Sequence, residues 1–298
     1  MVKNKKIGGC GTALITPFQT DGSVDERTLE ALVNWQIGEG VHFLVPCGTT
    51  GESSTLGHDE FRRVVEIVIR TASGRVPILA GAGGNDTSKV IALAAELKTL
   101  GADGLLSVSP YYNKPSQEGI YRHYRAIAES VDLPIIVYNV PGRTGSNVTP
   151  DTLIRLSEVP NIAGVKEASG DVAQISEICA RAPEGFAVLS GDDLLTLPII
   201  ALGGCGVISV AANEVPGMMA AFVTACLENR IDEARKWNCR LHPLMKANFV
   251  EANPVPVKAA LALMGKINEI YRLPLTRISE DARRKIASAL GMLDLISE

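Results

Sequence analysis

The sequence predicts an α/β protein with the architecture of a (β/α)8 barrel, followed by a C-terminal helical appendage. Short apolar segments alternate with longer amphipathic ones along most of the 298 residues. The short segments are rich in Val, Ile and Leu and show little polar alternation, which is typical of parallel strands buried on both faces. Because the alternation repeats eight times without a break in composition, we expect one barrel.

Eight of the short segments fit strands. Prolines open two of them, at Val76-Pro77 and Leu133-Pro134, and glycines such as Gly101 mark the returns from helix to strand. The expected strands lie near residues 12–16, 43–47, 77–81, 104–109, 134–139, 162–167, 186–190 and 206–210.

The longer segments show the spacing of amphipathic helices. Segment 58–73 places apolar residues at i, i+3, i+4, i+7 and i+8, and segment 86–100 repeats the pattern. Thr149-Pro150-Asp151 has the composition of a helix start, with a cap, a first-turn proline and a first-turn acid. After residue 211 only helices are expected, near 215–228, 231–249, 254–267 and 279–293.

We therefore divide the chain into a barrel, residues 1–228, and a C-terminal helical region, residues 229–298, packed on it. The alternative architecture is a doubly wound open sheet. Such a sheet more often has fewer strands and a phosphate-binding glycine turn. The nearest candidate, Gly81-Ala82-Gly83-Gly84-Asn85-Asp86, places Asp86 where the third glycine should stand, so a tight turn after a strand explains it better.

Composition excludes several classes of function. The net charge is −4 and no basic patch suggests nucleic acid. No apolar run is long enough to cross a membrane, and residues 1–6 are basic but lead into no apolar stretch of a secretory signal. The six cysteines show no paired spacing, which favours reduced thiols in the cytoplasm. The four histidines show no metal-binding spacing, so no metal is predicted.

Lys166 is the most informative residue. It follows the apolar run 162–165, and Ser169-Gly170-Asp171 ends the segment, so the amine stands at the end of a buried strand. A lysine there either reaches water or occupies a pocket. In a pocket, burial lowers the lysine pKa and makes the amine a nucleophile toward ketones.

The active sites of such barrels lie at the C-terminal ends of the strands. Hydroxyls, phenols, one arginine and one lysine gather there in this chain. They are Thr49, Thr50, Ser109, Tyr111, Tyr112, Tyr138, Arg143, Lys166, Ser190, Asp192 and Asp193.

These residues also have structural interpretations. Thr49-Thr50 could form a tight turn whose hydroxyls cap their own backbone. Tyr138 could be a core aromatic, and Arg143 a surface charge. Asp192-Asp193 could serve a helix N-terminus. Tyr111-Tyr112 suggests an interface, because exposed aromatic pairs are typical of one.

Together the residues fit a keto-acid Schiff-base site. A neutral lysine attacks a ketone and forms an iminium, which acidifies the neighbouring carbon and permits carbon–carbon bond chemistry through an enamine. A tyrosine such as Tyr138, hydrogen-bonded to threonine hydroxyls, could move the protons. The Thr49-Thr50 hydroxyls and amides could hold one carboxylate, and Arg143 another.

The motifs in combination resemble the dihydrodipicolinate synthase family of the N-acetylneuraminate lyase superfamily. The similarity runs nearly end to end, from Gly11-Thr12-Ala13 to Pro254-Val255-Pro256-Val257-Lys258. The motifs are G-T-T-G-E at 48–52, S-P-Y-Y-N-K-P at 109–115, Y-N-V-P-G-R-T at 138–144, G-V-K-E-A at 164–168 and S-G-D-D at 190–193.

This resemblance implies that pyruvate condenses on Lys166 and that the enamine attacks aspartate semialdehyde, a step in lysine and diaminopimelate synthesis. No cofactor is implied beyond this covalent Schiff base. Tyr138, Thr49 and Tyr112 match the family's proton relay, and Tyr112 is expected to come from a neighbouring subunit. The matching substrate-binding positions are Thr50, Gly191 and Ile208 for pyruvate and Arg143 for the aldehyde's carboxylate.

The resemblance also implies a homotetramer, as a dimer of dimers. Arg143 and G-T-T-G-E favour the synthase over the sialic acid lyases. The alternatives are another pyruvate-dependent class I aldolase, lyase or dehydratase, acting on 2-keto-3-deoxy sugar acids or N-acetylneuraminate, and a barrel retained only for binding. At the expected lysine-effector site, Phe61 and Lys89 replace the histidine and glutamate of lysine-inhibited members, so weak or absent lysine feedback is expected.

Overall fold

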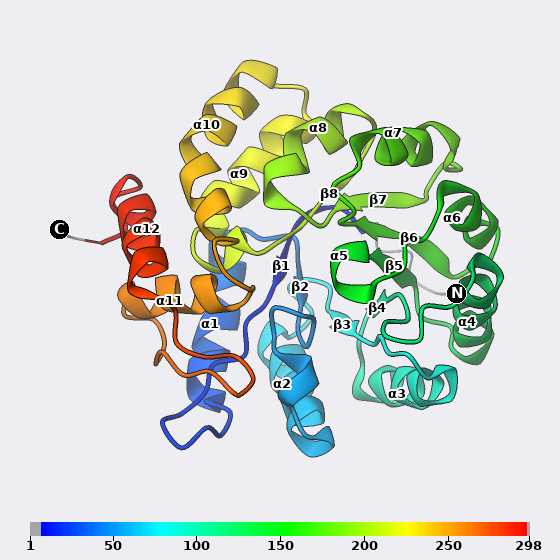
Figure 1. Ribbon diagram of the computed structural model, residues 1–298, viewed down its shortest axis with the longest axis horizontal. Coiled ribbons are helices and arrows are strands. Elements are labelled where there is room, and N and C mark those ends of the chain that lie inside the picture. The colour runs from blue at the N-terminus through cyan, green and yellow to red at the C-terminus, as the bar shows by residue number, and fades with distance from the viewer. Residues whose placement is uncertain (1–6, 297–298) are drawn as a thin grey trace.

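The strands pair in one parallel sheet that curls into a barrel, the TIM-barrel architecture (Figure 1). The computed structural model describes residues 7–296, so the interpretation of residues 1–6 lies outside the described chain. A bridge between Leu44 and Ile78 connects β2 to β3, where the sheet would otherwise end. The strands are β1 Gly9–Ala13, β2 Phe43–Val45, β3 Leu79–Gly81, β4 Gly104–Val108, β5 Ile135–Asn139, β6 Ile162–Glu167, β7 Ala187–Ser190 and β8 Gly206–Ser209.

Seven strands lie where the sequence predicts them, but the prediction of 12–16 for the first strand was wrong by three residues at each end. The strand is β1, Gly9–Ala13, which pairs with both β2 and β8. Its glycines reduce the strand signal, yet the packing requires them. A Cβ on Gly11 would lie 2.1 Å from the Phe43 ring, so no larger residue fits there.

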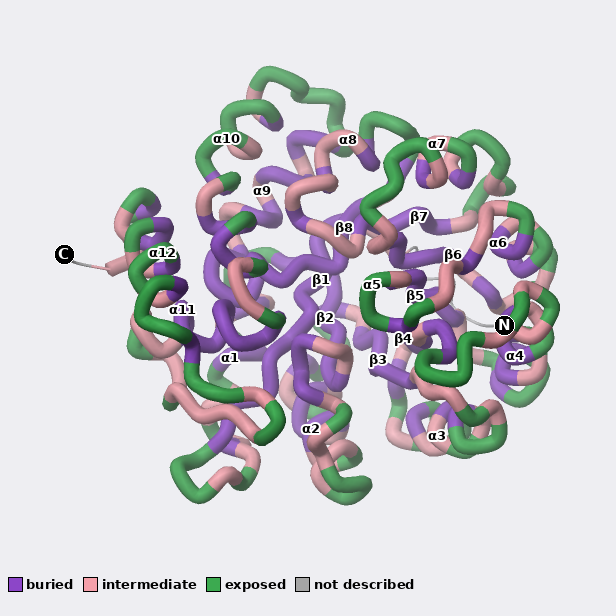
Figure 2. The backbone as a smooth tube through the Cα atoms, viewed as in Figure 1, coloured by how far each residue is buried: buried purple, intermediate pink, exposed green. Residues whose placement is uncertain are grey.

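Helices surround the barrel and bury one face each against it (Figures 1 and 2). They are α1 Glu26–Gly38, α2 His58–Ala72, α3 Thr87–Leu100, α4 Gln117–Ser130, α5 Pro141–Thr144, α6 Pro150–Ser157, α7 Val172–Arg181, α8 Thr196–Ala201 and α9 Pro216–Leu227. Short 3-10 turns lie at η1 Ser53–Thr55, η2 Asp193–Leu195 and η3 Ala211–Asn213. The predicted helices 58–73 and 86–100 correspond to α2 and α3.

The start of α6 is also as predicted, with Thr149 at the cap position and Pro150 in the first turn. The Thr149 side chain does not cap the helix, however. Its backbone N–H and its hydroxyl both donate to Oε1 of Gln117, at 3.1 and 3.2 Å.

The C-terminal part of the described chain is helical, as predicted, with α10 Ile231–Ala247, α11 Val255–Leu263 and α12 Glu280–Gly291. These helices share one apolar cluster with α9 and with Cys10 and Val207 of the barrel. Burial of this shared apolar surface stabilises the contact between these helices and the barrel residues of the cluster. Figure 1 shows α11 and α12 beside α1, on the flank that α10 also borders. Residues 7–296 contain no helix with the length and apolarity that a bilayer crossing requires.

Candidate active site

Lys166 and Tyr138 face each other across neighbouring strands. The parallel register of β5 and β6 makes their Cα atoms partners, so both side chains point to the same face of the sheet. Tyr138 belongs to the apolar cluster inside the barrel, together with Leu189 and Ile208. The Lys166 amine lies 4.4 Å from the centroid of the Tyr138 ring. The structure therefore places the predicted nucleophile inside the barrel, at the C-terminal end of β6.

Burial sets the state of this amine. Lys166 is only 5% exposed. Burial lowers its pKa from 10.5 to about 8, the Asp193 carboxylate opposes this shift and the Arg143 charge adds to it. A minority of the amine, but far more than for an ordinary lysine, is therefore neutral near physiological pH, as attack on a carbonyl requires.

Gly191 makes room for this lysine. A Cβ at position 191 would lie 3.0 Å from Cε of Lys166 and 2.7 Å from Cβ of Ala168. The Gly191 N–H donates to the carbonyl of Glu167 at 2.7 Å, which joins the turn after β7 to the end of β6. Glycine is therefore the residue that lets this turn approach the amine.

Tyr138 is buried and stays protonated. Burial raises its pKa, while the nearby Arg143 charge and a hydrogen bond with Thr49 oppose the shift. A neutral phenol in contact with a threonine hydroxyl can pass a proton in either direction, since each hydroxyl is both donor and acceptor. This geometry suits the proton shuttle expected from the sequence.

A cavity of about 340 Å³ opens beside Tyr138. Its polar lining includes Thr49 and Arg143, and its apolar lining includes Phe61 and Leu93. The volume is enough for a small substrate. Both the hydroxyl of Thr49 and the cation of Arg143 can therefore meet a bound molecule there.

Asn253 connects the two groups predicted to hold carboxylates. Its side-chain amide donates to Oγ1 of Thr50 at 3.0 Å, and its main-chain carbonyl accepts from Nη2 of Arg143 at 3.1 Å. Sequence reasoning gave Asn253 no role. The contact with Thr50 spans 203 residues, so only the folded chain reveals it.

Asp193 is a second residue whose position in the site was not predicted from the sequence. Its partner Asp192 caps η2 as expected, accepting from the N–H of Leu194 at 2.9 Å. The Asp193 side chain is instead buried against the residues that follow β8. Its Oδ2 accepts from the N–H groups of Val210 and Ala211, at 3.0 and 2.9 Å. This buried carboxylate raises the pKa of Lys166 and moderates the effect of burial.

Tyr112 is not brought into this site by its own chain. It is 88% exposed in the loop after β4 and has a left-handed backbone with φ of 72°. Its neighbour Tyr111 lines the cavity. Of the predicted site residues, Thr49, Tyr138 and Arg143 line the cavity, and Tyr112 is exposed to solvent. Lys166, Thr50, Gly191 and Ile208 are not among the residues that line it. Within residues 7–296, no three His, Cys, Asp or Glu side chains lie close enough together to hold a metal ion.

The model of the dihydrodipicolinate synthetase family matches residues 6–293. The chain is 53% identical over 292 residues to the 4-hydroxy-tetrahydrodipicolinate synthase of Koribacter versatilis, a match that covers 97% of both chains. It is 50% identical over 297 residues to the enzyme of that name from Prosthecochloris aestuarii, covering 99% and 100%.

Solved structures agree with these relatives. Dihydrodipicolinate synthase from Aquifex aeolicus is 44% identical, with a TM-score of 0.95 over 97% of this chain and 99% of that one. A structure described as the first monomeric dihydrodipicolinate synthase variant is 42% identical, with a TM-score of 0.97 over 99% of each chain.

The depressed pKa of Lys166 predicts a characteristic pH dependence. Competitive acetylation across a pH series, with mass spectrometry of the Lys166 peptide, should give a midpoint near 8 for reactivity, because only the neutral amine reacts. Asp193→Asn should move the midpoint to lower pH, since it removes the charge that favours the protonated amine. A midpoint near the ordinary value of 10.5 would contradict the assignment.

Proposed function

The chain belongs to the dihydrodipicolinate synthetase family, and we propose that Lys166 is the amine on which it condenses pyruvate with L-aspartate 4-semialdehyde. The enzyme is a lyase with class I aldolase chemistry. Its product, 4-hydroxy-tetrahydrodipicolinate, leads to diaminopimelate and lysine. The covalent Schiff base replaces any cofactor. The observation that carries the assignment of Lys166 is its buried amine, which has a pKa of about 8 and lies beside Tyr138.

The chemistry follows from the neutral amine. Nζ of Lys166 attacks the ketone carbon of pyruvate, and loss of water gives an iminium. The iminium draws electrons from the methyl carbon, which loses a proton and becomes the nucleophilic end of an enamine. That carbon then bonds to the aldehyde carbon of the second substrate, and the new alkoxide takes up a proton. Bond formation leaves Lys166 as an iminium again, and addition of water to it releases the product as a ketone and restores the free amine. The amino group of the product then condenses with this ketone off the enzyme, which closes the ring with loss of water.

Protons move through Tyr138 and Thr49 in this proposal. Tyr138 lies next to the amine and is hydrogen-bonded to Thr49, so it can supply the proton that carbinolamine dehydration requires and take one back later. Tyr112 completes the relay from a neighbouring subunit. Its exposure of 88% supports this role, because an exposed tyrosine in a left-handed loop is available to a second chain.

The two carboxylates are held by different groups. The Thr49-Thr50 turn, Gly191 and Ile208 surround the end of the barrel at which pyruvate becomes attached. Arg143 receives the carboxylate of the aldehyde substrate. Its guanidinium is joined to the carbonyl of Asn253 at the cavity wall, which leaves other N–H donors for the substrate. The relatives carry the name of the synthase rather than that of a sugar acid aldolase, so we retain the synthase reaction.

Borohydride trapping tests the proposed function. Pyruvate and borohydride together should add the mass of a reduced pyruvate adduct to the Lys166 peptide, and Lys166→Met should not be labelled. Arg143→Ala should retain trapping by pyruvate while the KM for aspartate semialdehyde rises about tenfold or more, because a charge-assisted contact is lost. A wild-type chain that pyruvate does not label would overturn the proposal. Sugar-acid aldehydes turned over faster than aspartate semialdehyde would favour the alternative aldolases.

We further propose that the enzyme works in the cytoplasm as a homotetramer, a dimer of dimers. A monomeric variant exists among similar solved structures, so the assembly of this chain requires direct measurement. Tyr112→Phe should lower kcat strongly if a neighbour supplies the hydroxyl. Mixing it with a Lys166→Met chain should restore activity, because a mixed dimer contains one site with both residues intact. A fully active monomer, shown by sedimentation, would contradict this arrangement.

The effector response is a separate proposal. At the expected inter-subunit effector site, Phe61 stands where lysine-inhibited members are expected to carry histidine, and Lys89 on α3 is exposed. The ammonium group of Lys89 repels the ammonium groups of a free lysine ligand rather than pairing with them. Lysine should therefore inhibit the condensation weakly in a steady-state assay, and the double variant Phe61→His, Lys89→Glu should become more sensitive. Strong inhibition of the wild type below millimolar lysine would contradict this.

A further inference from the structure

The turn that carries Thr49 and Thr50 has a constrained backbone. Cys47 and Glu52, on either side of it, have φ of 54° and 52°, a left-handed region that residues other than glycine rarely adopt. Such conformations persist where surrounding contacts hold them. The contacts of Glu52 and its neighbours show which parts of the fold do so.

Glu52 forms a buried ion pair with Lys258. Nζ of Lys258, in α11, donates to Oε1 of Glu52 at 2.6 Å across 206 residues of sequence. The two side chains are 0% and 1% exposed. The same Nζ lies 4.2 Å from the centroid of the Phe18 ring. Because removing one partner of such a pair leaves a buried charge without a counter-ion, the pair fixes the position of Glu52.

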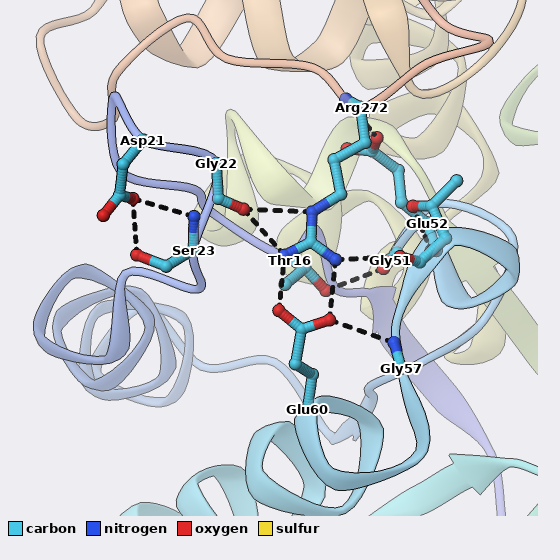
Figure 3. A network of polar contacts seen from close by, with 10 residues as sticks. Thr16, Asp21, Gly22, Ser23, Gly51, Glu52, Gly57, Glu60 and Arg272 are labelled. Atoms are coloured by element: carbon cyan, nitrogen blue, oxygen red, sulfur yellow. Dashed lines mark hydrogen bonds and ion pairs between the residues drawn. The ribbon is translucent and has the colours of Figure 1, made fainter.

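Arg272 binds the C-terminal end of the same turn. Its guanidinium donates to the carbonyl of Thr55 at 2.8 Å, where η1 ends, and its backbone N–H lies 3.5 Å from Oε2 of Glu52. Figure 3 shows the guanidinium between the carbonyl of Gly22 and the carboxylate of Glu60, which it binds as well. Arg272 thereby connects the turn to α2 and to the loop after β1.

Two further contacts hold the middle of the turn. The hydroxyl of Thr16 donates to the carbonyl of Gly51 at 2.7 Å, a bond also drawn in Figure 3, and the amide of Asn253 donates to Thr50. Every residue from Thr50 to Glu52 is therefore bound by a group distant in sequence. The C-terminal helical region supplies Lys258 and Arg272.

Lys258 contacts none of the groups proposed to hold the substrate. It is fully buried, and its Nζ lies against Glu52 and the rings of Phe18 and Tyr271. Any effect of Lys258 on the reaction must therefore pass through Glu52 and the turn. The same holds for Arg272, whose backbone N–H lies beside Glu52 and whose guanidinium binds Thr55, Gly22 and Glu60 and covers the Phe18 ring.

We propose that the Lys258–Glu52 ion pair is a positioning device that holds the Thr49-Thr50 turn in the shape that receives pyruvate's carboxylate. Lys258 is the positioning residue, and Arg272 supports it at the end of the turn. The inference rests on the proposed function for the identity of the bound carboxylate. The contacts that hold the turn are independent of that identity.

A matched pair of variants tests the inference. Lys258→Met removes the charge at similar volume. Lys266→Met is the control, because Lys266 also belongs to the C-terminal region and also covers an aromatic ring, with Nζ 3.7 Å from the centroid of Trp35. Lys258→Met should raise the KM for pyruvate about tenfold or more with a smaller change in kcat, because misplaced binding groups weaken substrate capture. Lys266→Met should leave both parameters near wild type.

Hydrogen exchange supplies a readout that does not need the substrate. Amides of residues 48–55 should exchange faster in Lys258→Met than in Lys266→Met, because the turn loses its fixed end. Unchanged exchange, or a pyruvate KM equal to that of the control, would overturn the inference. A fall in melting temperature alone, with KM unchanged, would reduce the pair to a purely structural role and likewise overturn it.

If Lys258→Met does not fold, Arg272→Met is compared with Lys266→Met by the same two criteria, the pyruvate KM and hydrogen exchange. Arg272 is suitable because it is only partly buried.

The proposed function and the positioning inference fail in distinguishable ways. A wild-type chain that pyruvate and borohydride do not label overturns the proposed function and the carboxylate assignment. A labelled wild type with normal pyruvate binding in both Lys258→Met and Arg272→Met overturns the positioning inference alone.

Discussion

The parallel register of β5 and β6 is the constraint on which the site depends. It sets Tyr138 opposite Lys166 and Asn139 opposite Glu167. Successive residues of a strand face opposite sides, so a slip by one residue would exchange the amine for a carboxylate inside the barrel. Glu167 is retained on the outer side by the side-chain amide of Asn139, whose Nδ2 donates to both of its oxygens, and by the N–H of Ser169. Polar contacts outside the barrel thus keep the nucleophile inside.

Opposing electrostatic effects set the pKa of Lys166. Burial favours the neutral form of the amine, which is the form that attacks a ketone. Asp193 opposes burial, and the resulting pKa of about 8 lets Lys166 exist in both forms near neutral pH. Asp193 is itself fixed by two backbone N–H groups after β8, so its charge stays at a constant place. The electrostatics therefore depend on the closure of the barrel between β7 and β8.

The sequence predicted the strands from their apolar periodicity and the site from the residues that follow the strand ends. Buried parallel strands have a strong apolar signal, and their C-terminal ends must share one rim, which is why Lys166, Tyr138 and the Thr49-Thr50 turn could be grouped before any coordinates. The first strand was misplaced because its glycines weaken the strand signal, although packing requires them: Gly9 lies against His42 and Gly11 against the Phe43 ring. Asn253 could not be found at all, since its contact with Thr50 spans 203 residues and depends on how the C-terminal helices dock.

That docking changes how the chain should be divided. The boundary between residues 228 and 229 was predicted from the point at which the strand–helix repeats give way to helices alone. It stays a prediction. Energetically the parts are connected where catalysis is proposed to occur. Asn253 binds both Thr50 and Arg143, and Lys258 holds Glu52 through a pair with 0% and 1% exposure. A turn with two left-handed residues has little intrinsic preference for its shape. Contacts from the helices that follow the barrel therefore stabilise a conformation of the turn that its own sequence does not favour.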